Sequence, residues 1–212
     1  MKTILFDIDG TLLDTDMLII RSYMHLFDTY RPEYPLKVEE LVSFLGPVLK
    51  DVFPKYFKED FHVLLNTYHT YSHQNIKRFV HLYDGVINML ETFKAKNYKL
   101  GVVTNRFDYS VKEVLEPFSI SHYFDVIITL NDVSNGKPNP EGILKAIEVL
   151  KANKEETIYV GDNKSDALAS RNAGIKDALV SWSYGRDNSL LKPYYLIKSF
   201  KEFTKEIINE EN

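Results

Sequence analysis

Apolar and polar positions follow two different periods along this chain. From residue 86 onward, short apolar runs alternate with segments in which apolar residues recur every three or four positions. The runs are typical of strands buried on both faces of a parallel sheet, and the other segments are typical of amphipathic helices. The pattern predicts strands at 4–6, 99–104, 126–130, 157–160 and 178–180, and helices at 86–96, 110–118, 141–152, 166–173 and 200–208.

Such an alternation predicts an α/β fold, with a Rossmann-like parallel sheet flanked by helices and joined by right-handed crossovers. Ser110 is the expected N-cap of helix 110–118, and Gly174 is the expected residue that ends helix 166–173.

Residues 16–80 interrupt this alternation directly after the first strand. Their apolar and aromatic residues recur at helical spacing throughout, which predicts helices at 17–30, 39–45, 48–56 and 60–79, the third broken at Pro54. Several antiparallel helices of this kind pack as a bundle. We therefore expect a core domain of residues 1–15 and 81–212 with an inserted helical-bundle domain of residues 16–80.

Composition narrows the possible functions. A hydrophobic content of 44% in 212 residues supports a sizeable core, and the net charge of −4 lacks the basic footprint of nucleic-acid binding. Without cysteine there are no disulfides, thiol nucleophiles or thiolate metal sites. No apolar run approaches the ~20 residues of a membrane span, and the start does not resemble a signal peptide. We expect a cytoplasmic monomer or homodimer that binds neither nucleic acid nor membrane.

The first strand ends on a cluster of polar residues, Asp7-Ile-Asp9-Gly10-Thr11. Two carboxylates so close repel each other unless a cation or a shared proton relieves them, and oxygen ligands suit Mg²⁺. Gly10 lets backbone approach a ligand, and Thr11 offers a hydroxyl. A site at the carboxyl end of a strand is one interpretation. An ordinary turn is the other, because Asp-Gly is a common turn dipeptide.

Strand 99–104 also ends on polar residues, Thr104-Asn105-Arg106. A hydroxyl, an amide and backbone N–H groups can together hold phosphate oxygens. Lys137 follows in the loop Gly-Lys-Pro-Asn-Pro at 136–140, where its ammonium offers a point charge. An ordinary strand-to-loop turn after Thr104 and a solvated surface lysine at Lys137 are the other interpretations.

Strand 157–160 is followed by Gly161-Asp162, with Asp166 at the start of the next helix. Asp166 has a second interpretation as a helix cap, which acids at that position perform well.

Taken in order, these four segments resemble the four motifs of the haloacid dehalogenase (HAD) superfamily, whose members are mostly phosphatases with an aspartyl-phosphate intermediate. The resemblance covers essentially the whole chain and implies that residues 16–80 are a cap, with crossings near 13–17 and 80–84 as its hinge. Related dehalogenases lack the acid found here at Asp9, phosphonate-cleaving relatives carry alanine there, and sugar-phosphate mutases tend to have valine in place of Thr11. These two residues favour a phosphatase.

The resemblance also implies residue roles. Asp7 would be the nucleophile and Asp9 the general acid and base, while Thr104 and Lys137 would position the phosphoryl group. Mg²⁺ would be held by Asp7, by the backbone carbonyl of Asp9 and by Asp162, with Asp166 acting through a coordinated water or through Lys137.

The substrate is expected to be a small phosphorylated metabolite. The segment 44–49 resembles a Gly-Pro-containing cap loop of phosphoglycolate phosphatases and related pyrophosphatases. Gly10, Thr11, Asn105, Arg106 and Lys50 are the predicted phosphate- or substrate-binding residues, and the two cations are also open to interpretation as solvated surface charges. Weaker expectations concern Arg21 and His25 on the first cap helix and Trp182 and Tyr184 at the cleft entrance. For Trp182 and Tyr184, packing in the core is the other interpretation.

Other functions stay open at this point. A pyrophosphatase, a sugar-phosphate phosphatase or a phosphomutase would share the motifs, and a phosphometabolite-binding regulator without turnover need not retain both Asp7 and Asp9.

Overall fold

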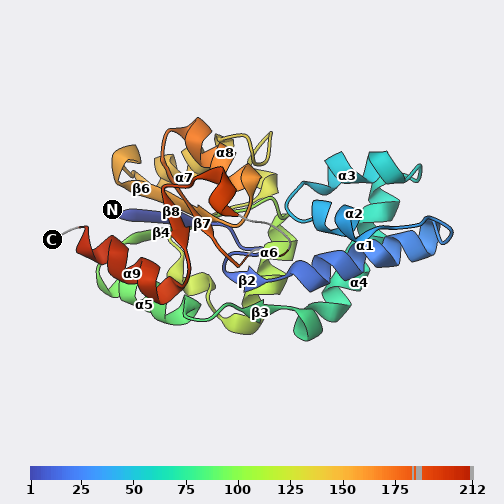
Figure 1. Cartoon of the computed structure of the whole chain (residues 1–212), viewed down its shortest axis with the longest axis horizontal. Helices are drawn as coiled ribbons and strands as arrows, with labels where there is room; N and C mark the ends of the chain where they lie inside the picture. Colours follow the sequence, from blue (N-terminus) through green and yellow to red (C-terminus); the bar gives the residue numbers. More distant parts are fainter. Residues whose placement is uncertain (183, 185–187, 211–212) are drawn as a thin grey trace.

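The computed structural model describes residues 1–182, 184 and 188–210. Its centre is a parallel sheet with the strand order β5-β4-β1-β6-β7-β8 (Figure 1). The strands are β1 (Thr3–Phe6), β4 (Lys99–Val103), β5 (Val126–Ile128), β6 (Thr157–Gly161), β7 (Lys176–Val180) and β8 (Tyr195–Ile197). The predicted α/β fold is therefore confirmed.

Alternate residues of β1 face the two helical layers. Ile4 and Phe6 pack with α5 (Val86–Ala95), α6 (Asp108–Leu115) and α9 (Phe200–Asn209), whereas Leu5 packs with α7 (Glu141–Leu150) and α8 (Lys164–Ala173). All four residues of β1 are buried because β4 and β6 flank the strand and helices cover both faces. The first strand is thus constrained on both faces and along both edges.

A separate helical segment lies at the carboxyl ends of the central strands. It comprises α1 (Asp16–Tyr30), α2 (Val38–Ser43), α3 (Leu49–Tyr56) and α4 (Phe61–Phe79). Its interior is an aromatic cluster of its own, in which Tyr23 contacts Phe44, Phe53 and Tyr68. Figure 1 shows these four helices together on one side of the molecule, with both chain termini at the far end of the sheet.

Two chain crossings connect this segment to the sheet. They pair as a short antiparallel ribbon of β2 (Leu13–Asp14) and β3 (His81–Leu82). Within the described part of the chain, none of the helices combines the length and apolarity needed to cross a membrane.

The structure corrects three details of the sequence prediction. Pro54 does not break α3, because in so short a helix it costs one backbone hydrogen bond while Val52 and Phe53 still bury their side chains. Ser110 is not an N-cap, since α6 begins at Asp108, whose N–H donates to Asn131 Oδ1. The edge strand β8 was not predicted.

Candidate active site

The sheet order brings the predicted motifs together. β4 and β6 are the two neighbours of β1, so the residues that follow these three strands meet at one edge of the sheet. Asp7 continues the ladder past Phe6, its N–H donating to the carbonyl of Val160 at 2.9 Å. Asp7, Thr104 and Asp162 therefore line one cleft, and all three are buried.

Lys137 links the nucleophile candidate to the last motif. Its Nζ lies 2.8 Å from Asp7 Oδ1 and donates to Asp166 Oδ1 at 2.7 Å and to the Tyr159 hydroxyl at 2.9 Å. Tyr159 in turn donates to the carbonyl of Val103 at 2.7 Å. The ammonium is therefore fixed from three sides. No sequence pattern marked Tyr159 as a functional residue, because a tyrosine inside an apolar strand is typical of the core.

Both oxygens of Asp166 are held by hydrogen bonds, Oδ1 by Lys137 and Oδ2 by backbone N–H groups. Oδ2 accepts the N–H groups of Asp162 and Asn163, each at 3.0 Å, which is the capping geometry expected for an acid at a helix start. Gly161 makes this approach possible, since a Cβ there would lie 2.3 Å from Asp166 Cβ. Asp166 does not line the cleft. It accepts hydrogen bonds from Lys137 and from the Asp162 loop and so holds both in place.

Burial sets the ionisation of this group of residues. It raises the pKa of Asp7 to about 7, despite the opposing charge of Lys137 and with added repulsion from Asp166. Burial alone would lower the pKa of Lys137, but the carboxylates of Asp166 and Asp7 outweigh it and raise that pKa above its usual value. Lys137 is thus a permanent cation.

A metal ion fits the acidic end of the cleft. Oxygens of Asp7, Asp162 and Asp166 lie within 4.8 Å of one another. Asp7 Oδ1 is buried, and its contact within the described part of the chain is the ion pair with Lys137 at 2.8 Å. Three buried carboxylates around one ammonium leave excess negative charge, which a cation would relieve. An oxygen-only site suits a hard divalent cation.

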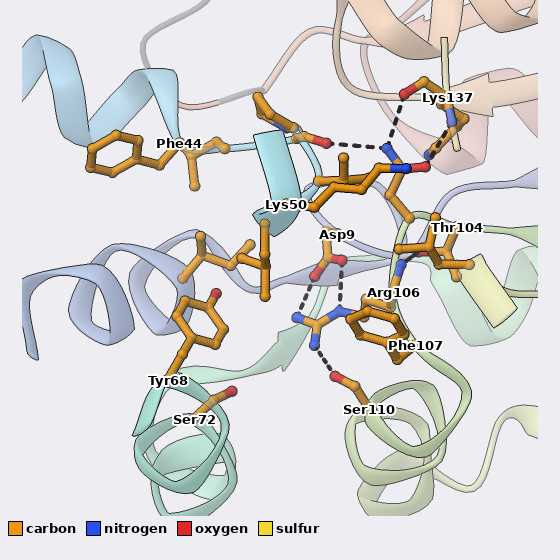
Figure 2. A pocket seen from close by; sticks show the side chains of 18 of the residues that line it. Asp9, Phe44, Lys50, Tyr68, Ser72, Thr104, Arg106, Phe107, Ser110 and Lys137 are labelled. Atoms are coloured by element: carbon orange, nitrogen blue, oxygen red, sulfur yellow. Dashed lines mark hydrogen bonds and ion pairs between the residues drawn. The ribbon is translucent and has the colours of Figure 1, made fainter. Parts of the chain in front are cut away.

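Asp9 forms a different set of contacts from Asp7 (Figure 2). Its two oxygens accept hydrogen bonds from Arg106 Nε and Nη2, both at 2.7 Å, and from the Thr15 hydroxyl. Burial would raise the pKa of Asp9, but the charge and hydrogen bonds of Arg106 outweigh it and hold that pKa below its usual value. Arg106 also donates from Nη1 to Ser110 Oγ at 2.7 Å, and its backbone N–H donates to Thr104 Oγ1.

Asn105 is engaged with the Lys137 loop. Its Oδ1 accepts the N–H of Lys137 at 2.8 Å, and its Nδ2 donates to the carbonyl of Lys137 at 3.2 Å and to that of Gly46 at 3.4 Å. Gly46 belongs to the helical segment and has a φ of 103°, and a Cβ there would lie 2.8 Å from Asn163 Nδ2. The predicted Gly-Pro loop therefore contacts the core at two asparagines, of which Asn163 was not predicted.

Two of the remaining predicted residues lie outside the cleft lining. Gly10, with a φ of 70°, lies against the carboxylate of Asp162 and does not line the cleft. Thr11 is fully buried. Thr11 Oγ1 has no hydrogen-bond partner among the described residues. Lys50 does line the cleft, from the exposed start of α3.

The cleft has a volume of about 340 Å³ and lies between the sheet edge and the helical segment. Sequence patterns assigned Tyr68 to the interior of the helical segment, yet it also lines the cleft together with Ser72, four positions along α4. Phe107 and Tyr109 line it from the core side. The helical pattern places Tyr68 and Ser72 on one face of their helix. No sequence pattern reveals that such a face covers a cleft.

The weaker expectations lie away from the cleft. Arg21 is exposed, and the ring of His25 stacks on that of Tyr71 with 4.7 Å between their centroids. Neither residue lines the cleft. Trp182 packs between Tyr83 and Phe200, with ring centroids 5.4 and 5.1 Å from its own. Tyr184 is exposed, and its neighbours 183 and 185 lie outside the described residues.

Comparison with known proteins decides the family. The family model described as haloacid dehalogenase-like hydrolase matches residues 4–180. The chain belongs to the haloacid dehalogenase-like hydrolases. The match covers the sheet from β1 to β7, the helical segment and all four motifs, and it confirms the resemblance noted in the sequence.

Relatives in this family carry a specific name. Pyrophosphatase PpaX of Halalkalibacterium halodurans is 38% identical to this haloacid dehalogenase-like hydrolase over 205 residues, which is 95% of this chain and 94% of the relative. Pyrophosphatase PpaX of Bacillus cereus is 38% identical over 183 residues, which is 86% of this chain and 84% of the relative.

A solved structure described as a predicted phosphoglycolate phosphatase from Haemophilus somnus superposes with a TM-score of 0.84 at 24% identity, covering 96% of each chain. A haloacid dehalogenase-like family protein from Streptococcus pneumoniae superposes with a TM-score of 0.82 at 24% identity, covering 97% of this chain and 98% of the other. At these identities the likeness shows the fold alone.

Proposed function

We propose that this hydrolase is a Mg²⁺-dependent phosphatase that transfers the phosphoryl group of a small metabolite to Asp7 and then to water. The observation that carries the proposal is the surroundings of Asp7. Its carboxylate lies buried in the cleft, with the fixed ammonium of Lys137 at 2.8 Å from Oδ1. A nucleophile for phosphorus needs such an accessible position in the cleft and nearby positive charge.

The reaction has two steps. One Asp7 oxygen attacks phosphorus and forms an aspartyl-phosphate, while Asp9 gives its proton to the departing oxygen. Asp9 then takes a proton from water, which attacks the intermediate, releases phosphate and restores Asp7. Thr104 and Lys137 hold the phosphoryl oxygens throughout.

Mg²⁺ would be held by Asp7, by Asp162 and by the backbone carbonyl of Asp9, with Asp166 acting through Lys137 or a bound water. When bound, it neutralises charge that gathers on the phosphoryl oxygens. The supporting observation is the cluster of buried carboxylate oxygens described above.

Residues 16–80 act in this proposal as a cap on a core of residues 1–15 and 81–212. The cap would exclude bulk water and select the leaving group. In support, α1, α3 and α4 contribute cleft-lining side chains, among them Ile19, Lys50 and Tyr68, and the Gly46 turn reaches Asn105.

Two substrates are candidates. Phosphoglycolate is the first, because the Gly-Pro loop of the cap resembles that of phosphoglycolate phosphatases. Pyrophosphate is the second, supported by relatives 38% identical that are named pyrophosphatases. Each would place a second negative charge in a cleft that contains Arg106 and Lys50.

The test is phosphate release with Mg²⁺ across a panel of phosphoglycolate, pyrophosphate, sugar phosphates, nucleotides and p-nitrophenyl phosphate. We expect release from the aryl phosphate and from at least one of the two candidates. A folded protein that releases phosphate from none of them would instead be a binding regulator. Isomerised sugar phosphate without free phosphate would indicate a phosphomutase.

A further inference from the structure

The guanidinium of Arg106 is paired with the general acid of the proposed reaction. Its Nε and Nη2 form a two-pronged pair with Asp9, and Nη1 is anchored to Ser110 on α6, as Figure 2 shows. The side chains of Arg106 and Asp9 are only 12% and 21% exposed. Bidentate pairs of this kind, partly withdrawn from water, are among the stronger polar contacts in proteins.

This pairing conflicts with the chemistry that Asp9 must perform. Asp9 Oδ1 accepts from Arg106 and from Thr15, and Oδ2 accepts from Arg106. These three donors leave one lone-pair position, on Oδ2, and a two-pronged guanidinium favours the carboxylate form of Asp9, which has no proton to give. Arg106 must therefore release Asp9 before Asp9 can protonate a leaving group, and a nearly buried guanidinium without an anion is costly.

We propose that Arg106 determines substrate class by exchanging partners: it gives up Asp9 for an anionic group carried by the leaving group. The substrates are then phosphate esters or anhydrides whose leaving group bears its own carboxylate or phosphate. Binding such a substrate and freeing Asp9 become one event. This inference rests on the proposed function and specifies its substrate.

The position of Arg106 supports the exchange. Ser110 holds Nη1 on the side away from Asp9, so the guanidinium can turn about that contact without losing it. The other cations that line the described cleft are placed differently: Lys137 is tied to Asp7 and Asp166, and Lys50 lies at the exposed start of α3. A planar carboxylate or a phosphate can accept the same two-pronged contact that Asp9 now accepts.

Binding of unreactive ligands tests the exchange without turnover. Calorimetry in Mg²⁺ would compare methylenediphosphonate, which carries a second anion, with ethylphosphonate, which does not. The proteins are the wild type, Arg106→Gln, Asp9→Asn and the double variant. Arg106→Lys keeps the positive charge but loses the planar, two-pronged donor group. Lys112→Gln is a control that removes an exposed cation of α6 outside the cleft lining.

The readout is the ratio of the two dissociation constants. Arg106→Gln should reduce the preference for methylenediphosphonate roughly tenfold or more, the scale of a hydrogen bond to a charged group. Asp9→Asn removes the competing carboxylate and should raise that preference by a similar factor, but only where Arg106 is present. Arg106→Lys should fall between the wild type and Arg106→Gln, and Lys112→Gln should match the wild type.

Two results would overturn the proposal. One is an unchanged preference in Arg106→Gln, and the other is an Asp9→Asn effect that persists in the double variant, which would show that the effect does not act through Arg106. Circular dichroism of each variant excludes misfolding as the cause. Failure of the proposed function is a separate result, because it shows as absent phosphate release while these binding ratios remain measurable.

Discussion

Gly10 and Asp162 lie far apart in the sequence and against each other in the structure. A Cβ on Gly10 would lie 2.4 Å from Asp162 Oδ2, and Gly10 has a φ of 70°. The turn after the first strand therefore supports the carboxylate after β6 from its far side. Any side chain at residue 10 must push Asp162 toward the cleft or distort the turn.

Gly10→Ala should consequently weaken the metal site. We expect Mg²⁺ affinity to fall roughly 10- to 100-fold, the range seen when the support of a metal ligand is lost. Gly174→Ala is the matched control, because Gly174 has a φ of 75° and no atom of the described residues lies within 4 Å of the place its Cβ would take. Both variants carry the backbone strain of roughly 1–2 kcal/mol. Calorimetry of Mg²⁺ binding should separate them, and equal affinities would contradict a role for the contact with Asp162.

Asp7→Asn should abolish turnover and preserve the fold. The amide is nearly isosteric but is a poor nucleophile, so phosphate release should drop by roughly 10⁴-fold or more. Asp177→Asn is the control: Asp177 is also a buried acid, paired with Arg171 at 2.8 Å, but it lies outside the cleft lining. It should lose stability and keep activity. A folded Asp7→Asn protein with wild-type rates would exclude the proposed mechanism.

The pH dependence of stability should expose the buried state of Asp7. The pKa of Asp7 is about 7 in the folded, metal-free protein, whereas the ordinary value for an aspartate is 3.8. Between these values the unfolded chain has released a proton that the folded chain still holds, so the free energy of unfolding falls as pH rises. From pH 5 to 7.5 the loss due to Asp7 is at most about 3 kcal/mol.

Thermal unfolding in EDTA at these two pH values measures this loss. The wild type should lose more stability than Asp7→Asn, which has no proton to release at residue 7. The comparison between the two proteins cancels groups that titrate in both. A larger loss in Asp7→Asn than in the wild type would show that burial does not raise this pKa.

Activity should also depend on the identity of the metal. Chelation by EDTA should abolish phosphate release and Mg²⁺ should restore it. Ca²⁺ should occupy the same oxygens and inhibit, because its longer and more variable coordination misplaces the nucleophile. Competition between Ca²⁺ and Mg²⁺ in steady-state kinetics checks this. Release that chelation leaves untouched would rule out the metal site.

The sequence was informative wherever a strand ends on polar residues. The end of an apolar run marks the end of a strand, and parallel strands bring such ends together at one edge of the sheet. The sequence therefore predicted that Asp7, Thr104 and Asp162 lie close together. The contacts of Arg106 with Asp9 were not predictable, since they join residues far apart in sequence whose side-chain directions no periodicity encodes.

Local competition explains the failures. Ser110 has the chemistry of a helix cap, but Asn131, which is distant in sequence, satisfies the N–H of Asp108 and starts the helix earlier. Tyr159 is a core residue by pattern, yet its hydroxyl reaches Lys137 and the carbonyl of Val103. In each case a tertiary contact decided the outcome.

The side chain of Asn105 contacts both the Gly46 turn of the helical segment and the backbone of Lys137. It binds the backbone N–H and carbonyl of Lys137 and reaches the carbonyl of Gly46. Asn105→Ala removes these contacts, so Lys137 should lose its fixed position beside Asp7. Because the ammonium serves the phosphoryl group common to all substrates, kcat should fall roughly 10- to 100-fold for every phosphate tested.

The pattern across substrates distinguishes this effect from that of Arg106. Asn105→Ala should lower kcat for phosphoglycolate, pyrophosphate and p-nitrophenyl phosphate by a similar factor, whereas Arg106→Gln should spare the aryl phosphate. Asn139→Ala is the control within the same loop, because Asn139 is exposed and its side chain accepts only the N–H of Glu141 among the contacts described. It should retain kcat. If Asn105→Ala affected only the substrates with a charged leaving group, Asn105 would recognise that group directly and would not act through Lys137.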